Sequence, residues 1–165
     1  MNQTPPIAAP DALRRVMAAF PTGVAVVTAR DAGGEAVGLT VNSFTSVSLD
    51  PPLVLVCLDH GSASHAVVLA AGTFAVNFLP RGAEAVSETF ARGEPGERFQ
   101  GLAWREEVTG SPVLGEALGW LDCRVHQTHV AGDHTIVVGR VLACAATESA
   151  PLVYWRGGYR EVTGP

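Results

Sequence analysis

Short, tight turns join neighbouring strand-like runs along this chain, and they limit the fold more than any other feature. The turn at 31–34 follows a β-rich run at 23–29 and leads into a second run at 35–41. The turn at 131–134 joins the runs 120–130 and 135–146, and the turn at 156–158 joins 152–155 and 159–162. Turns of this length connect antiparallel neighbours, because parallel strands need a long crossover. The sequence therefore predicts three β-hairpins.

The remaining periodic segments fit the same architecture. Further strands are expected at 44–47, 53–58 and 73–79, and helices are expected at 10–20, 62–71 and 83–90. Together these make about eight strands and two or three helices, with mostly antiparallel connections. We therefore expect a mainly β fold of the α+β type, a closed or split antiparallel β-barrel with a few flanking helices.

The length of 165 residues favours one domain with a substantial core. Residues 1–9 are expected to form a disordered lead-in, and residues 10–165 are expected to form one folded domain. The segment 80–118 carries more charge and glycine and few strand signals. It is expected to be an excursion from the sheet rather than a second domain.

The composition excludes some classes of partner. The formal net charge is −5, and the eleven basic residues are all Arg and form no basic block, so neither nucleic acid nor an anionic membrane is expected as a partner. The longest uninterrupted apolar run, 66–71, is too short to cross a bilayer, and no secretory leader is visible, so a cytoplasmic protein is expected.

Cys57, Cys123 and Cys144 lie among apolar strand residues and are expected to be buried free thiols. With 47% apolar and 16% charged residues, the chain favours a subunit that buries part of its surface in an oligomer.

A polar stretch at 38–52 interrupts the strand pattern and indicates a ligand site. Six hydroxyl and amide residues fall within nine positions: Thr40, Asn42, Ser43, Thr45, Ser46 and Ser48. A strand built only for a core does not need these side chains. A kink in such a strand turns backbone N–H groups outward, and a flat polar ligand or a phosphate requires donors of this kind.

The segment 60–65 follows a strand and opens a helix, and two interpretations of it stay open. Ser62 or Ser64 can cap the helix by accepting from free backbone N–H groups. The same helix N-terminus, with two hydroxyls, also suits a phosphate. The cap is the simpler interpretation for this segment alone, but its place after the polar stretch allows both to line one groove.

Other chemical motifs are weak. The chain has no Gly-x-Gly-x-x-Gly after a strand and no Gly-x-x-x-x-Gly-Lys, which makes a Rossmann site or a P-loop improbable. His126 and His129 point to opposite faces of a predicted strand, so they cannot chelate one metal ion together. Ser87 and Cys57 have no local base partner, so no nucleophile arrangement is expected. His134 is open between a turn residue and a residue that meets a ligand at the barrel rim. Residues 156–159 are open between a plain turn and a flap that carries an aromatic side chain.

The order and spacing of these segments carry a resemblance to a known family. In sequence order they are Phe20-Pro-Thr-Gly-Val24, the stretch 38–52, Ser62-x-Ser64, Phe74-x-Val-Asn77, Gly132-Asp-His134 and 151–159. Together they resemble the short-chain flavin reductase family, the reductase components of two-component flavin monooxygenases. The resemblance covers nearly the whole chain after about residue 10.

The resemblance implies a split barrel of the FMN-binding type, a homodimer, and the following site. The isoalloxazine ring would lie against Thr40, Val41, Asn42, Ser43 and Ser46, largely through backbone groups. The ribityl chain and phosphate would lie against Leu58, Asp59, Ser62 and Ser64, and the flavin tail against Arg98 and Phe99. The nicotinamide would lie near the catalytic residue His134, in a pocket also framed by Thr22 and Tyr159. The family often has Lys where this chain can offer only Arg.

The activity that the resemblance implies is NAD(P)H-dependent reduction of FMN or FAD, with the reduced flavin supplied to a partner monooxygenase. Hydride transfer needs two stacked rings more than an acid–base pair, which fits a site rich in hydroxyls and poor in nucleophiles. A flavin-binding carrier or sensor without turnover stays open as the alternative, because a fold does not determine function.

Overall fold

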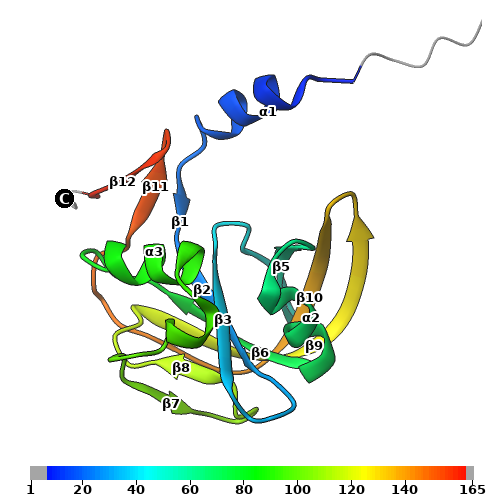
Figure 1. The fold of residues 1–165 in the computed structure, drawn as a ribbon, viewed down its shortest axis with the longest axis vertical. Coiled ribbons are helices and arrows are strands. Elements are labelled where there is room, and N and C mark those ends of the chain that lie inside the picture. Colours follow the sequence, from blue (N-terminus) through cyan, green and yellow to red (C-terminus); the bar gives the residue numbers. More distant parts are fainter. Residues whose placement is uncertain (1–6, 163–165) are drawn as a thin grey trace, which may run out of the picture.

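The computed structural model describes residues 7–162 and is built around one curled antiparallel sheet (Figure 1). The seven strands of this sheet lie in the order β3-β2-β6-β9-β10-β5-β4. Their bounds are Ala36–Val41 (β3), Ala25–Arg30 (β2), Thr73–Phe78 (β6), Gly119–Ala131 (β9), His134–Ala146 (β10), Pro52–Asp59 (β5) and Thr45–Leu49 (β4). Among the described residues, β3 and β4 form the two edges of this sheet and are not paired with each other. The mainly β, antiparallel split barrel that the sequence predicts is therefore confirmed.

Strand β2 has buried side chains on both faces of the sheet. Its residues are buried almost without interruption, so alternate side chains serve two cores. Ala25, Val27 and Ala29 face the barrel interior, whereas Val24 and Val26 belong to a second cluster outside the barrel. The helix α3 (Glu84–Arg92) and the β8 strand (Pro112–Leu114) contribute Phe90 and Leu114 to this outer cluster.

The excursion at 80–118 closes over the sheet rather than leaving it. It contains α3, the short 3-10 helix η1 (Pro95–Glu97), and a hairpin of β7 (Trp104–Glu106) and β8, which the sequence did not predict. The fully buried amide of Asn77 fixes it to the sheet, because its Oδ1 accepts from Leu114 N at 2.8 Å while its Nδ2 donates to Val26 O at 3.1 Å. The two strands were missed because three-residue strands carry too few positions for a periodicity signal.

The N-terminal and C-terminal segments form an arm that stands beside the barrel (Figure 1). It consists of α1 (Pro10–Met17), β1 (Thr22–Gly23), β11 (Val153–Trp155) and β12 (Gly158–Arg160), with β11 in the middle of the three strands. The indole of Trp155 donates to Ala19 O at 3.1 Å and joins the two ends of the chain. Helix α1 ends earlier than the expected residue 20, and none of its residues is buried.

Four other expectations meet the structure with mixed results. The three hairpins are present as β2–β3, β9–β10 and β11–β12, and the kink expected in the polar stretch is a register shift between Ser46 and Ser48 in β4. The expectation that all three thiols are buried is wrong: Cys123 is buried, Cys57 is half-buried and Cys144 is exposed. Of the expected lead-in at 1–9, residues 1–6 lie outside the described residues.

Candidate active site

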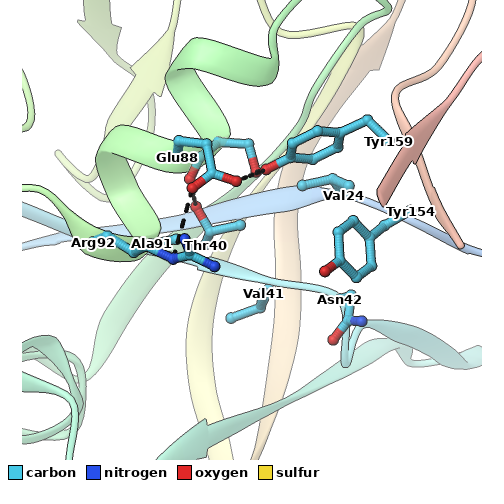
Figure 2. Close-up of a pocket in the computed structure, with 10 residues that line it drawn as sticks. Val24, Thr40, Val41, Asn42, Glu88, Ala91, Arg92, Tyr154 and Tyr159 are labelled. Carbon is cyan, nitrogen blue, oxygen red and sulfur yellow. Dashed lines mark hydrogen bonds and ion pairs between the residues drawn. The ribbon is translucent and has the colours of Figure 1, made fainter. Parts of the chain in front are cut away.

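A hollow of about 170 Å³, open to solvent, lies where α3, β3 and the C-terminal hairpin meet (Figure 2). The end of β3 contributes Thr40 and Val41 to its wall, and Asn42, which follows the strand, also lines it. Its other lining residues are Val24, Ser87, Glu88, Ala91, Arg92, Tyr154 and Tyr159. The structure therefore brings the polar end of β3 together with Tyr159, which lies more than a hundred residues away in sequence.

Side-chain hydrogen bonds hold the wall of this hollow in place. The Thr40 hydroxyl donates to Ser87 O at 2.7 Å and ties β3 to α3. The Tyr159 hydroxyl lies 2.9 Å from Ser87 Oγ and 2.9 Å from Glu88 Oε1, which ties β12 to the same helix. Burial raises the pKa of Tyr159, and the neighbouring Glu88 carboxylate raises it further. The phenol therefore stays protonated and acts as a donor at neutral pH.

A second hollow adjoins the first and shares Asn42 with it. Its lining includes Thr22, Phe44 and Phe78, and the two Phe rings pack edge to face with centroids 4.9 Å apart. The Thr22 hydroxyl oxygen is buried and has no hydrogen-bond partner among the described residues. A buried hydroxyl without a partner costs stability, so a ligand with a polar edge that enters this hollow would remove that cost.

The N-terminus of α2 (Ala63–Ala71) lies close to the start of β3 and to Arg98. Ser62 caps the helix, since its hydroxyl accepts from Ser64 N at 3.3 Å. Ser64 is buried and its own hydroxyl donates to Gly38 O at 3.0 Å, and Arg98 Nη1 donates to the same carbonyl at 2.6 Å. The cap interpretation is therefore right for Ser62. The site still combines a helix N-terminus with a guanidinium, and both favour an anion.

The remaining predicted flavin contacts are limited by their packing. Ser43 exchanges two hydrogen bonds with the backbone of Cys57, with its hydroxyl donating to Cys57 O at 2.9 Å and accepting from Cys57 N at 3.1 Å. Ser46 is exposed on the edge strand β4. Leu58 is completely buried, so neither its side chain nor its backbone is exposed to solvent in this chain. Asp59 accepts from Gly61 N at 2.7 Å and shapes the turn before α2.

The Phe99 side chain packs into the outer core cluster. Its ring packs edge to face against Phe90 and Trp104, with centroids 5.0 Å and 6.3 Å away, in the outer core cluster. Phe99 therefore positions Arg98, its neighbour in sequence, whose Nε donates to Gly93 O at 3.0 Å.

His134 lies at the start of β10, opposite Asp59 of β5. Its Nδ1 lies 2.7 Å from Asp133 Oδ1, and this hydrogen bond is the main cause that lowers the pKa of the Asp133 carboxyl. His134 lines neither of the two hollows described above. Within one chain, the structure does not bring His134 together with Thr22 and Tyr159.

A pair of histidines beside α2 is a feature that sequence reasoning missed. His60 Nε2 and His65 Nε2 lie 3.0 Å and 2.9 Å from the buried Thr135 hydroxyl. A hydroxyl has one proton to give, so at least one imidazole must donate to it. Sequence reasoning also missed Glu88, Arg92 and Tyr154 and considered Ser87 only as a nucleophile, because nothing local in the sequence connects α3 with the distant β3 and β12.

The part of the chain that the structure describes has neither a cluster of metal ligands nor a helix suited to cross a membrane. No three His, Cys, Asp or Glu side chains there lie close enough to hold a metal ion together. None of the described helices has the length and apolar content that crossing a membrane requires.

Comparisons with known proteins agree with this geometry. Residues 17–163 match the model of the flavin reductase like domain. A probable flavin reductase of Rhizobium meliloti is 47% identical over 150 residues, and the reductase subunit of stachydrine N-demethylase of the same organism is 44% identical over 150 residues. These alignments cover 91% of this chain, which spans about half (48%) of the first relative and 65% of the second. The NADH:FAD oxidoreductase of Streptomyces globisporus, solved in complex with NAD and FAD fragments, superimposes with a TM-score of 0.87 at 36% identity, covering 96% of this chain and 97% of that one.

Proposed function

The chain belongs to the flavin reductase-like family, and we propose that it is an NAD(P)H:flavin oxidoreductase that reduces FMN or FAD and supplies the reduced flavin to a partner monooxygenase. The observation that carries the proposal is the place of the polar end of β3. It lies between two hollows, one of which is lined by Thr22, whose hydroxyl has no partner among the described residues. Earlier in β3, the carbonyl of Gly38 accepts from Ser64 of α2 and from Arg98. The names of the relatives, a flavin reductase and a reductase subunit of a demethylase, support the same activity.

We place the flavin along the polar stretch, held mainly by main-chain groups. Thr40, Val41, Asn42, Ser43 and Ser46 would hold the ring, and Leu58, Asp59, Ser62, Ser64 and Arg98 would hold the ribityl chain and phosphate. The hydroxyls of Ser43 and Ser64 already bond inside the protein, so these two residues would act through the backbone. The α2 N-terminus and Arg98 would supply the positive potential for the phosphate.

The chemistry needs alignment more than a protein acid or base. The hydride carries both electrons of the broken bond from nicotinamide C4 to flavin N5, so the nicotinamide is oxidised and the flavin is reduced. The protein holds the two rings face to face at reacting distance. We propose that His134 orients the nicotinamide carboxamide, and that Thr22 and Tyr159 frame the same pocket.

This pocket requires a homodimer, which we include in the proposal. The β9–β10 hairpin, whose turn carries His134, and the β11–β12 hairpin, which carries Tyr159, lie on opposite sides of one chain (Figure 1). A pocket that uses both residues must take them from two copies. Large apolar side chains that a dimer could bury are exposed on β4 and β9, with Leu49 94% and Val130 80% exposed.

A mixed-dimer experiment tests that arrangement. His134→Ala and Tyr159→Phe subunits, each with low activity alone, are unfolded together and refolded as a mixture. Random pairing restores about a quarter of the wild-type activity, because half of the dimers then have one intact pocket of two. Activity that stays at the level of the separate variants contradicts a shared pocket.

The proposed activity itself is tested by the loss of reduced-nicotinamide absorbance with FMN or FAD, using NADH and NADPH in turn. Flavin-dependent turnover is expected, and its complete absence, with flavin still bound, would favour a carrier or sensor instead. His134→Ala is expected to raise the KM for the nicotinamide more than it weakens flavin binding, and unchanged kinetics would remove His134 from the site. We also propose a cytoplasmic location, since exposed Cys144 is a free thiol and such thiols persist in reducing compartments.

A further inference from the structure

Two residues among those that line the first hollow, beside α3, carry charge, and they lie side by side on that helix. The Glu88 carboxylate lies on the rim near Tyr159, and its Oε2 lies 3.7 Å from Arg92 Nε (Figure 2). Arg92 has a side chain that is 82% exposed, whereas the Glu88 side chain is 47% exposed. Arg92 is therefore free to leave the pair, while Glu88 is fixed from its other side.

The direction of the hydrogen bonds fixes the Glu88 carboxylate. An ionised carboxylate only accepts, so the Tyr159 phenol must donate to Glu88 Oε1, and the buried Ser87 hydroxyl donates to the phenol oxygen. The raised pKa of Tyr159 agrees with a phenol that keeps its proton. A carboxylate has about four acceptor positions, and Tyr159 uses one of them, while Arg92 forms an ion pair with Glu88 at 3.7 Å, beyond hydrogen-bond distance. Glu88 thus presents fixed, unused acceptor positions and a negative charge at the hollow.

We propose that Glu88 is the residue that selects NADH over NADPH. Its carboxylate accepts from the 2′-hydroxyl of the adenosine ribose of NADH and repels the 2′-phosphate that NADPH carries at that position, the discrimination that an acidic residue gives in other nicotinamide sites. This inference rests on the proposed function and on the nicotinamide nucleotide occupying this hollow in a folded pose, with its adenosine ribose near its nicotinamide. Arg92 has the opposite preference, because a guanidinium attracts a 2′-phosphate, and its ion pair with Glu88 weakens that attraction.

A purely structural role for Glu88 is the competing explanation. By accepting from Tyr159, Glu88 also fastens the β11–β12 hairpin to α3. Glu88→Gln separates the two roles, because an amide oxygen can still accept from the phenol while the charge is gone. Tyr159→Phe does the reverse, since it removes the hydrogen bond between the phenol and Glu88 and leaves the charge of the Glu88 carboxylate.

The experiment measures kcat/KM for NADH and NADPH at saturating flavin in the wild-type protein and four variants. Glu88→Gln is expected to raise kcat/KM for NADPH about tenfold and to change the NADH value much less, with the gain shrinking as salt increases. Arg92→Gln is expected to lower the NADPH value. Glu84→Gln, the same change one turn earlier on α3 and outside the hollow, is the matched control, with an expected change below about twofold. Tyr159→Phe is expected to impair both co-substrates without changing their ratio.

Two results overturn the assignment: an NADPH/NADH ratio that Glu88→Gln leaves unchanged within about twofold, or the same ratio change in Glu84→Gln. Calorimetric titration of NAD⁺ and NADP⁺ into the wild type and Glu88→Gln gives the answer independently of turnover. Tighter NADP⁺ binding in Glu88→Gln supports the assignment even if no flavin is reduced, in which case the proposed function alone fails. Absence of nicotinamide binding in every form overturns both.

Discussion

Gly38 is the position where the structure makes the sharpest prediction. Its carbonyl receives the Ser64 and Arg98 hydrogen bonds, and its Cα faces the outer core. A Cβ at this position would lie 2.8 Å from Cε1 of Phe90 and 3.0 Å from the carbonyl oxygen of Val27. Neither neighbour can retreat easily, because Val27 belongs to the paired strand β2 and the Phe90 ring is buried.

Gly38→Ala should therefore destabilise the protein through overpacking. Forced insertion of a methyl group into a packed core costs about 2 kcal/mol. For a chain of this length, that cost lowers the melting temperature by about 4–8 °C. Urea unfolding followed by circular dichroism measures the free energy of unfolding, and thermal unfolding measures the shift. Gly96→Ala is the matched control, because a Cβ there meets nothing within 4 Å.

A double variant tests the cause of the loss. Phe90→Leu shortens the ring that the new methyl group would meet, so Gly38→Ala should cost at least about 1 kcal/mol less in that background. The reasoning is refuted if Gly38→Ala alone costs less than about 0.5 kcal/mol, the range of an ordinary surface change. It is also refuted if the cost is the same with and without the Phe90 ring.

The other predictions concern titration, thiol reactivity and helix capping. Replacing His134 by Ala should move the lowered pKa of Asp133 back up toward its ordinary range, as followed by carboxyl NMR. Because that pKa is lowered in the folded state, the stabilisation from this pair is present above the unfolded pKa and is lost as the pH falls through the folded one. Burial raises the pKa of Cys123 to about 12, so in native protein alkylation should reach the exposed Cys144 first, and mass spectrometry should show Cys123 unmodified. Ser62→Ala should lower the free energy of unfolding by about 1 kcal/mol in urea titrations, because the α2 cap is lost, whereas Ser62→Asp should keep most of it.

The parts of the fold that could be predicted from the sequence are those that a few adjacent residues determine. Tight turns and alternating apolar runs are properties of a few adjacent residues, which is why the three hairpins and the helix at α2 were found. The helix expected to reach residue 20 ends at Met17, because the chain turns there to meet Trp155, and no local signal encodes that contact. Strands β7 and β8 were missed because they are too short for a periodicity signal and because long-range bonds such as the one to Asn77 hold them in place.

In the candidate site, too, local sequence patterns could be predicted, whereas long-range contacts could not. The hydroxyl side chains in the stretch 38–52 predicted one wall of a ligand site, and in the structure Asn42 lines two hollows. The sequence could not show which hydroxyls are already used inside the protein, as that of Ser64 is. It also could not show that α3 lies against β3, so Glu88 had no visible partner.

One chain of contacts connects the proposed flavin and nicotinamide ends of the site, and it gives Gly38 a second readout. Arg98 bonds to Gly38 on the flavin side, and two residues along β3 the Thr40 hydroxyl bonds to α3 at Ser87. Ser87 in turn contacts Tyr159 at 2.9 Å. A methyl group at Gly38 that pushes on Phe90 of α3 therefore moves the helix that carries Ser87. Gly38→Ala should raise the KM for flavin and for the nicotinamide together, whereas a change confined to the phosphate end, such as Ser62→Ala, should raise the flavin KM alone.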